Sequence, residues 1–268
     1  MAYRSTVPDN PFFPRPPMPD TLPQRRMLPT LLLLVAAASW GGNWVAARAV
    51  YLDVPPFALV FWRWALAAAL IFPFAAAQLR EDAQLVRSHL PALAAFGVIG
   101  TAGFTMFGYW GVLCIMGAGD VPALARLSLN PGDLLLLAGA LLWAIYTVLL
   151  KWRPPLQPLS FVFVTVAAGA VFSLPFYLGE IAAGGTMLVS PKTVVAIGYL
   201  AVFPSVVAYI CWNRAVPIVG PNVAGFFNPI IPVFGTLFAV ILLGERLHLY
   251  HLAGFALVLG GVVLTSKR

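Results

Sequence analysis

Residues 28–48 read LPTLLLLVAAASWGGNWVAAR, and this stretch decides which kind of fold the chain adopts. It is almost entirely apolar over about 20 residues, the length that an α-helix needs to cross the hydrocarbon core of a bilayer. A single amide side chain, Asn43, stands inside it between Trp40 and Trp44. The stretch therefore predicts a membrane-spanning helix that carries one polar group among aromatic neighbours.

The rest of the chain has the same character. Of its 268 residues, 61% are hydrophobic and 9% are charged, whereas about 25% of the residues in a soluble domain are charged. This composition excludes a soluble enzyme, a nucleic-acid binder and a disordered protein. Long unbroken apolar runs also exclude an outer-membrane barrel, whose strands alternate between apolar and polar residues. The sequence predicts an all-α polytopic membrane protein.

Eight apolar runs are long enough to span a bilayer as helices. Several contain glycine or proline, which membrane helices tolerate because neighbouring helices satisfy the freed backbone groups. The predicted spans are Leu28–Arg48, Pro56–Ala77, Leu90–Gly117, Gly132–Lys151, Leu159–Leu178, Thr193–Asn213, Pro221–Leu243 and His248–Ser266.

The positions of the basic residues predict the orientation of these spans. Residues 1–29 hold eight prolines and four arginines, which predicts a disordered tail rather than a helix. With that tail in the cytoplasm, 11 of the 16 Lys and Arg residues lie in cytoplasmic segments and four lie opposite, while Arg63 lies within a span. An excess of Lys and Arg marks the cytoplasmic side. We therefore expect both termini to be cytoplasmic in a bacterial-type inner membrane, and we interpret the net charge of +7 as a topology signal.

An internal repeat is visible in the spacing of aromatic and proline residues. Trp40 and Trp143 are 103 residues apart, Pro73 and Pro175 are 102 apart, and Trp110 and Trp212 are also 102 apart. Three spans separate the copies, so the two copies have inverted topology. The second copy, 132–268, continues for two more helices, and its 137 residues exceed the 102-residue spacing by 35. The sequence predicts three helices in a first repeat at 30–115, a loop at 116–131, and five helices in the second repeat.

Several motifs resemble the EamA-like permeases of the drug/metabolite transporter superfamily. They are Trp40–Trp44 in the first span, Phe61–Trp64 in the second, and Tyr209–Ala215 at the end of the sixth. The most specific are Asn228 to Pro232 followed by Leu243–Leu247, which reads LGERL. The resemblance implies two inverted repeats, usually ten helices in all, cytoplasmic termini and transport of small metabolites. This chain departs from it by lacking the last two helices of the first repeat.

Two polar residues within the first two spans are candidate substrate contacts. Polar side chains at membrane depth usually face the bundle interior or a wet cavity. Asn43 either offers its amide to a substrate, with Trp44 as an apolar wall suited to an amine, or makes an interhelical hydrogen bond. Arg63 either extends its guanidinium to the outer interface, or pairs with Asp53 or with a substrate carboxylate.

Further candidates lie in the second repeat and in its broken helix. Tyr146 and Tyr209 either line a cavity or belong, with Tyr109, Trp110 and Trp212, to an interfacial aromatic belt. Pro229 and Pro232 cannot donate backbone hydrogen bonds, so the helix around Asn228 has free carbonyl groups that either bind substrate or form a hinge. Broken helices between repeats commonly mark transporter sites.

The sequence therefore predicts a secondary transporter that exports small metabolites or amino acids by alternating access. The alternative is a truncated remnant that does not transport, or a subunit that depends on a partner. We expect a small-molecule substrate and the lipid bilayer as partners, and a homo-oligomer remains open. No catalytic set, cofactor motif or metal site is predicted, because the Glu245, His248 and His251 spacing has no second motif to complete a metal site.

Overall fold

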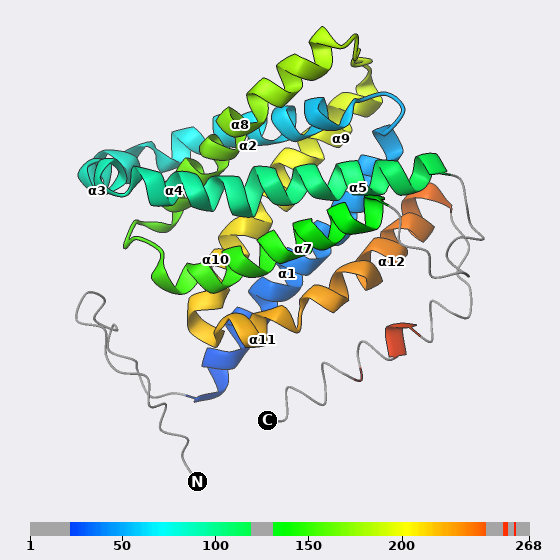
Figure 1. Cartoon of the computed structure of the whole chain (residues 1–268). Coiled ribbons are helices and arrows are strands. Elements are labelled where there is room, and N and C mark those ends of the chain that lie inside the picture. Colours follow the sequence, from blue (N-terminus) through cyan, green and yellow to red (C-terminus); the bar gives the residue numbers. More distant parts are fainter. Residues whose placement is uncertain (1–21, 119–130, 245–253, 257–259, 261–268) are drawn as a thin grey trace.

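The fold is a bundle of helices (Figure 1). A computed structural model describes residues 22–118, 131–244, 254–256 and 260, and every regular element within these ranges is helical. Seven helices of the described part are long and apolar enough to cross a membrane. They correspond to the first seven predicted spans, whereas the eighth, His248–Ser266, lies almost wholly outside the described residues. The chain is an all-α polytopic membrane protein.

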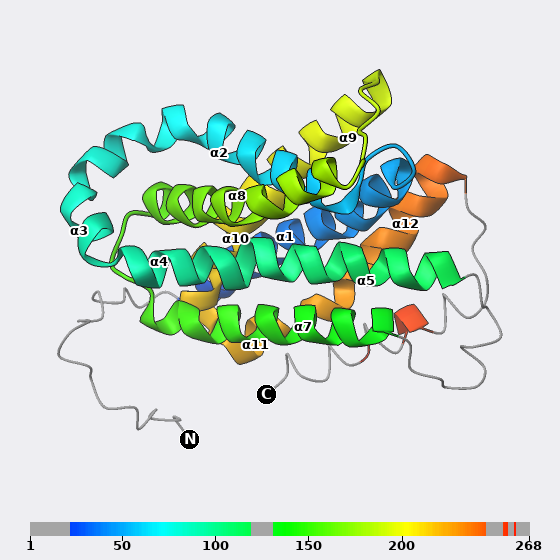
Figure 2. The same ribbon diagram turned by 45° about the horizontal axis from the view of Figure 1, so that its top comes forward.

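The part of the chain before residue 119 forms three spans. The third span is one continuous helical rod, in which the short π-helical segment η1 separates two α-helices (Figure 2). The short helix α3 precedes this span. The elements are α1 (Leu22–Val50), α2 (Pro56–Glu81), α3 (Ala83–Ser88), α4 (Leu90–Gly97), η1 (Val98–Gly103) and α5 (Phe104–Ala118).

The described residues from 131 onward form four spans. The third of these, Pro191–Val219, again contains a π-helical segment, η3, and the fourth is broken near its start. The elements are α7 (Pro131–Leu149), η2 (Leu150–Trp152), α8 (Pro158–Ala182), α9 (Pro191–Leu200), η3 (Ala201–Val207), α10 (Ala208–Val219), α11 (Pro221–Gly225), η4 (Asn228–Ile230) and α12 (Ile231–Leu243).

Several predicted boundaries differ from the observed ones by a few residues, and two of them have a clear physical reason. Helix α1 begins at Leu22, so residues 22–29, predicted as part of the disordered tail, are helical. Pro23 stands in the first turn, where a missing N–H breaks no hydrogen bond. The sixth span continues to Val219 rather than ending at Asn213. Gly220, with a φ of 83°, ends this helix in a conformation that suits glycine.

Helices α2 and α8 pack along most of their lengths and run antiparallel (Figures 1 and 2). At one end, the Glu180 carboxylate of α8 accepts hydrogen bonds from the backbone N–H groups of Phe57 and Ala58, at 3.2 and 2.7 Å. At the other end, Gln78 Oε1 of α2 accepts from the N–H of Leu159 at 3.0 Å. The first turn of each helix is thus capped by a side chain from the last turns of the other.

The two capping contacts are related by the 102-residue spacing that the aromatic and proline residues show. Gln78 and Glu180 are 102 residues apart, and so are Phe57 and Leu159. The π-helical segments η1 and η3 begin 103 residues apart. The equivalence that the aromatic residues suggested therefore extends to groups that hold the helices together.

Helix α1 lies at the centre of the bundle and packs against α9, α10 and α12. It approaches α12 closely at Gly41, where a Cβ atom would lie 2.8 Å from the backbone nitrogen of Gly235. Helix α5 packs against α7 in a similar way, because a Cβ at Gly111 would lie 2.8 Å from the carbonyl oxygen of Gly132. Glycines at these crossings allow the backbones to approach.

Candidate functional site

The centre of the bundle contains a buried polar network around Arg63. Its Nε donates to Ser205 Oγ at 2.7 Å, and its Nη1 donates to Asn43 Oδ1 and to the Tyr109 hydroxyl, both at 2.7 Å. Tyr109 in turn donates to Asn43 Oδ1 at 2.8 Å. The guanidinium also lies 4.5 Å from the ring centroid of Trp64, in the range of a cation–π contact. The network joins α1, α2 and α5 to η3.

The structure excludes two of the three predicted roles of Arg63, which are extension to the outer interface and pairing with Asp53. The side chain is 2% exposed, so it does not extend to the outer interface. Asp53 is not its partner either, because Asp53 forms an ion pair with Lys192 at 2.8 Å. Both of these expectations are wrong for the same physical reason. The guanidinium satisfies its donors inside the protein with Asn43, Tyr109 and Ser205, which lie on three different elements.

Trp44 borders this network. It is partly buried, and its ring makes an edge contact with Tyr109 at a centroid distance of 6.0 Å. Gly108 leaves room for the Trp44 ring, which a Cβ at that position would approach to 3.1 Å. Of the predicted candidates, Asn43, Trp44 and Arg63 therefore come together at one place.

A cluster of aromatic residues continues from the network into the second half of the bundle. Tyr146 and Tyr209 are 0% and 1% exposed, and both rings pack on Trp143, at centroid distances of 5.3 and 5.9 Å. The Tyr146 hydroxyl donates to Asn213 Oδ1 at 2.7 Å, and the Tyr209 hydroxyl donates to the carbonyl oxygen of Gly100 in η1. An interfacial belt is thus the wrong interpretation for these tyrosines.

Two other aromatic residues, Tyr109 and Trp212, do not belong to an interfacial belt either. Tyr109 and Trp212 are buried at 6% and 1%, whereas Trp110 is 38% exposed and stacks on Phe57 at 5.3 Å. Trp40 connects the cluster to the Arg63 network, because its ring contacts those of Trp143 and Trp212 and its Nε1 donates to the carbonyl oxygen of Pro204 at 3.0 Å. One continuous interior therefore links residues from both halves.

Asn228 and its prolines lie apart from these contacts. The helix is broken as the sequence predicts, since α11 ends at Gly225 and α12 begins at Ile231. The Oδ1 atom of Asn228 is buried without a hydrogen-bond partner, and η4 packs against α1. Pro229 and Pro232 are exposed. The break thus adjoins the central helix, but none of these residues bonds to the Arg63 network.

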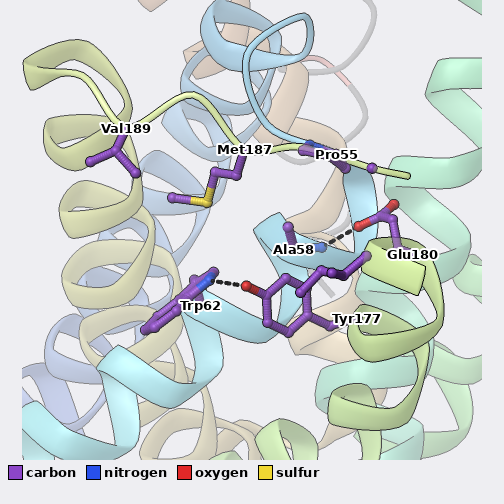
Figure 3. A pocket seen from close by; sticks show the side chains of 9 residues that line it. Pro55, Ala58, Trp62, Tyr177, Glu180, Met187 and Val189 are labelled. Carbon is purple, nitrogen blue, oxygen red and sulfur yellow. Dashed lines mark hydrogen bonds between the residues drawn. The ribbon is translucent and has the colours of Figure 1, made fainter. Parts of the chain in front are cut away.

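A pocket of about 280 Å³ opens at the end of the α2–α8 pair where Glu180 lies (Figure 3). Trp62 and Tyr177 form one wall and are joined by a hydrogen bond of 3.2 Å from Trp62 Nε1 to the tyrosine hydroxyl. Met187 and Val189 cover the opposite side in the view of Figure 3. None of these residues was predicted, because the pocket forms only where the chain after α8 folds back over α2.

Two buried polar residues were also missed, Ser205 in the Arg63 network and Asn213 in the aromatic cluster. Ser205 follows Pro204 in the sixth span, and a hydroxyl group in an apolar helix commonly bonds to its own backbone. Ser205 does donate to the carbonyl of Leu200 at 2.7 Å, but it also accepts from Arg63. Asn213 was interpreted as closing a helix, yet it is 2% exposed and accepts from Tyr146. The sequence signal that could have marked them is a polar side chain inside an apolar run or at its end.

Seven apolar spans in the described part of the chain, with a buried polar network between them, define a polytopic membrane protein. The model of the EamA-like transporter family matches residues 27–118 and 130–267. The chain therefore belongs to the EamA-like transporter family. The first matched segment has about two thirds of the length of the second.

Similar proteins agree with this assignment. An "Uncharacterized transporter" of Archaeoglobus fulgidus is 24% identical over an alignment covering 89% of this chain and 97% of that protein. "Uncharacterized transporter YyaM" of Bacillus subtilis is 29% identical over 60% of this chain and 52% of its own length. A solved crystal structure that is 20% identical matches 90% of this chain and 99% of its own with a TM-score of 0.70, which shows the shared fold. This chain is thus a membrane transporter.

Proposed function

We propose that this chain is an inner-membrane permease that exports small metabolites or amino acids by alternating access. The observation that carries the proposal is the buried network in which Arg63, Asn43 and Tyr109 of the first matched segment meet Ser205 of the second. Polar groups at membrane depth, placed between two repeats, are typical of transporter substrate sites. Asn43, Trp44, Arg63, Tyr146 and Tyr209 are the proposed substrate contacts.

The proposed mechanism rests on the 102-residue correspondence between the halves. In an inverted pair, rocking of one repeat against the other exchanges an inward-open state for an outward-open one. The caps of Glu180 and Gln78 at opposite ends of α2 and α8 fit this scheme, since one lies at each end of the pair. The break between α11 and α12, with Pro229 and Pro232, supplies a hinge beside α1.

The excess of basic residues places both termini in the cytoplasm in this proposal, and the substrate gradient drives export. Proton exchange would need a carboxylate carrier at membrane depth. In the described spans, the acidic residues lie near the helix ends, as Glu81, Asp133 and Glu180 do. We therefore favour a gradient-driven mechanism.

Efflux from loaded cells tests the function directly. Cells that express the chain are loaded with a panel of labelled amino acids, and the wild type is compared with Asn43→Ala and with empty vector. We expect N43A to slow efflux by about tenfold or more, because a hydrogen bond to a charged group contributes about 1.5–3 kcal/mol. Ile145→Ala, on an exposed part of α7, is the matched control and should export at the wild-type rate. Wild-type efflux equal to that of empty vector for the whole panel would contradict the proposal.

A second candidate function follows from the shorter first half. The alignment with the Archaeoglobus protein runs over 287 positions, more than the 268 residues of this chain, so that relative has segments with no counterpart here. Helix α7 also leaves a row of large apolar residues exposed: Leu134, Leu137, Leu141, Ile145 and Val148. A partner-dependent subunit, or a remnant that does not transport, would have such a face.

Size and stability measurements separate the two candidates. The full chain is purified in detergent, and its mass and melting temperature are determined. A stable monomer that exports favours the complete permease, whereas a chain that melts early and is stabilised only with other subunits favours the second candidate.

A further inference from the structure

None of the described residues that contact the Arg63 guanidinium carries a negative charge. Among the described residues, it is the only charged residue within a span that is buried, and its hydrogen-bond partners Ser205, Asn43 and Tyr109 are all neutral. Its ring neighbour, Trp64, is neutral as well. An isolated charge in a low-dielectric interior is strongly unfavourable unless an opposite charge accompanies it. Among the described residues, the positive charge of Arg63 is therefore not balanced by a negative charge.

Some N–H donors of the Arg63 network make no hydrogen bond to a described residue. A guanidinium has five N–H donors, and Arg63 uses one on Nε and two on Nη1, so the two on Nη2 donate to no described residue. Asn43 accepts twice through Oδ1, while its Nδ2 likewise donates to none. The free groups on these two facing side chains are therefore donors.

The aromatic cluster contains two further N–H groups, and these two are fully buried. Trp212 Nε1 and Asn213 Nδ2 are buried donors without a partner. The cluster is continuous with the Arg63 site, because Trp64 lies against Tyr209 at a centroid distance of 5.4 Å and Tyr209 lies against Trp143. Buried donors without acceptors are uncommon in native proteins. Within the described Arg63 network and aromatic cluster, the groups without a partner are thus N–H donors beside a positive charge.

We infer that the central site binds a carboxylate group of the substrate, with Arg63 as its counter-charge and Asn43 as a further donor. The inference rests on the proposed function and specifies its substrate class: carboxylic acids, including zwitterionic amino acids. Amines without a carboxylate are excluded, because their charge would face the Arg63 guanidinium. Arg–carboxylate pairs are strong and directional, since the planar fork donates two hydrogen bonds.

A variant that supplies its own carboxylate is the sharpest test. Asn43→Asp keeps the shape of the side chain and places a negative charge where Oδ1 already accepts from Arg63 at 2.7 Å. We expect N43D to fold at least as stably as the wild type and to bind carboxylates at least about tenfold more weakly, because the buried guanidinium is already neutralised. If Arg63 served only to hold the helices together, N43D would leave ligand binding unchanged. Arg63→Gln is the more obvious change, but it removes three hydrogen bonds between helices and endangers folding.

The measurement is the melting temperature of the purified full chain with matched ligands. The probes are the twenty common L-amino acids, their N-acetyl derivatives and their carboxamides, tested against wild type, N43D and the control Ile145→Ala. We expect some acids to raise the melting temperature of wild type and I145A while the corresponding amides do not, and we expect N43D to lose this response. The inference is overturned if no acid stabilises the wild type, if amides stabilise it equally, or if N43D responds as the wild type does.

Transport in proteoliposomes distinguishes this inference from the proposed function. Acid-specific stabilisation without movement of any labelled acid contradicts transport and leaves the carboxylate site standing. Transport of amides as fast as acids contradicts the carboxylate site and leaves the permease standing.

Discussion

Helices α1 and α7 have corresponding sequences and different surroundings. Trp40 of α1 and Trp143 of α7 are 103 residues apart and touch each other across the centre, at a centroid distance of 4.8 Å. Beyond this contact the two helices differ. Gly41, Gly42 and Val45 of α1 are buried, whereas the residues 103 positions later, Ala144, Ile145 and Val148, are exposed.

The difference lies in what covers each helix. Helix α12 packs against α1 at Gly41, and Tyr199 of α9 reaches Gly42. Helix α7 has α5 on one side, through Gly139 and Gly111. We propose that the first repeat lacks two helices and that the exposed row on α7 is the place where they would pack. Equivalent sequence positions thus become core or lipid-facing according to the number of neighbours.

The largest expected effect comes from placing a large side chain at Gly41, where α1 packs against α12. Gly41→Leu would drive a side chain into the Gly235 backbone, which a Cβ alone would approach to 2.8 Å. Ordinary overpacking costs about 1–3 kcal/mol, and here the obstacle is backbone, so we expect no folded protein. The matched Ala144→Leu on the exposed α7 face should leave the melting temperature within a few degrees of the wild type. Equal loss of folded protein in both variants, judged by size-exclusion chromatography in detergent, would show that α7 is covered as well.

A smaller difference in stability is expected between variants at Gly42 of α1 and Ile145 of α7. Gly42→Ala places a methyl group against the Tyr199 hydroxyl, which donates to the carbonyl of Ser39 at 3.3 Å. The ring end has to move, so we expect destabilisation of about 1–3 kcal/mol. The partner change Ile145→Ala should stay within about 0.5 kcal/mol, as surface substitutions do. Thermal unfolding of the two variants side by side checks this, and a larger loss in I145A would reverse the comparison.

The smallest effects concern the caps, where the halves are equivalent rather than different. Glu180→Ala and Gln78→Ala each remove the side chain that satisfies the first turn of the neighbouring helix. We expect similar losses of about 1 kcal/mol, the usual contribution of a helix cap. Because Asp82 also accepts from the N–H of Gln157 at 2.8 Å, the Q78A loss should be the smaller one. Denaturation of both variants in the same detergent tests the equivalence, which a severalfold difference would contradict.

The membrane spans could be predicted from the sequence because each one requires an apolar run of about 20 residues. Seven predicted runs correspond to the seven described spans, and the deviations occur at ends that depend on single residues, such as Gly220. Local polar residues were predictable as candidates too, since Asn43 and Arg63 stand out in apolar runs. Their partners were not predictable, because Ser205 lies 142 residues from Arg63 and meets it only through the packing of η3 on α2. Hydropathy carries no information about such pairings.

The π-helical segment η1 determines where the residues after it point. A π turn accommodates one residue more than an α turn, and each residue of an α-helix advances the direction of the side chain by about 100°. Side chains beyond Gly103 are therefore rotated relative to those before Val98. Tyr109 faces Arg63 through this rotation, so the length of 98–103 sets the angular register of the site. Closing the π turn without removing a residue would turn the tyrosine away from the guanidinium by about 100°, whereas a one-residue deletion there would restore a regular helix and keep the direction of the tyrosine.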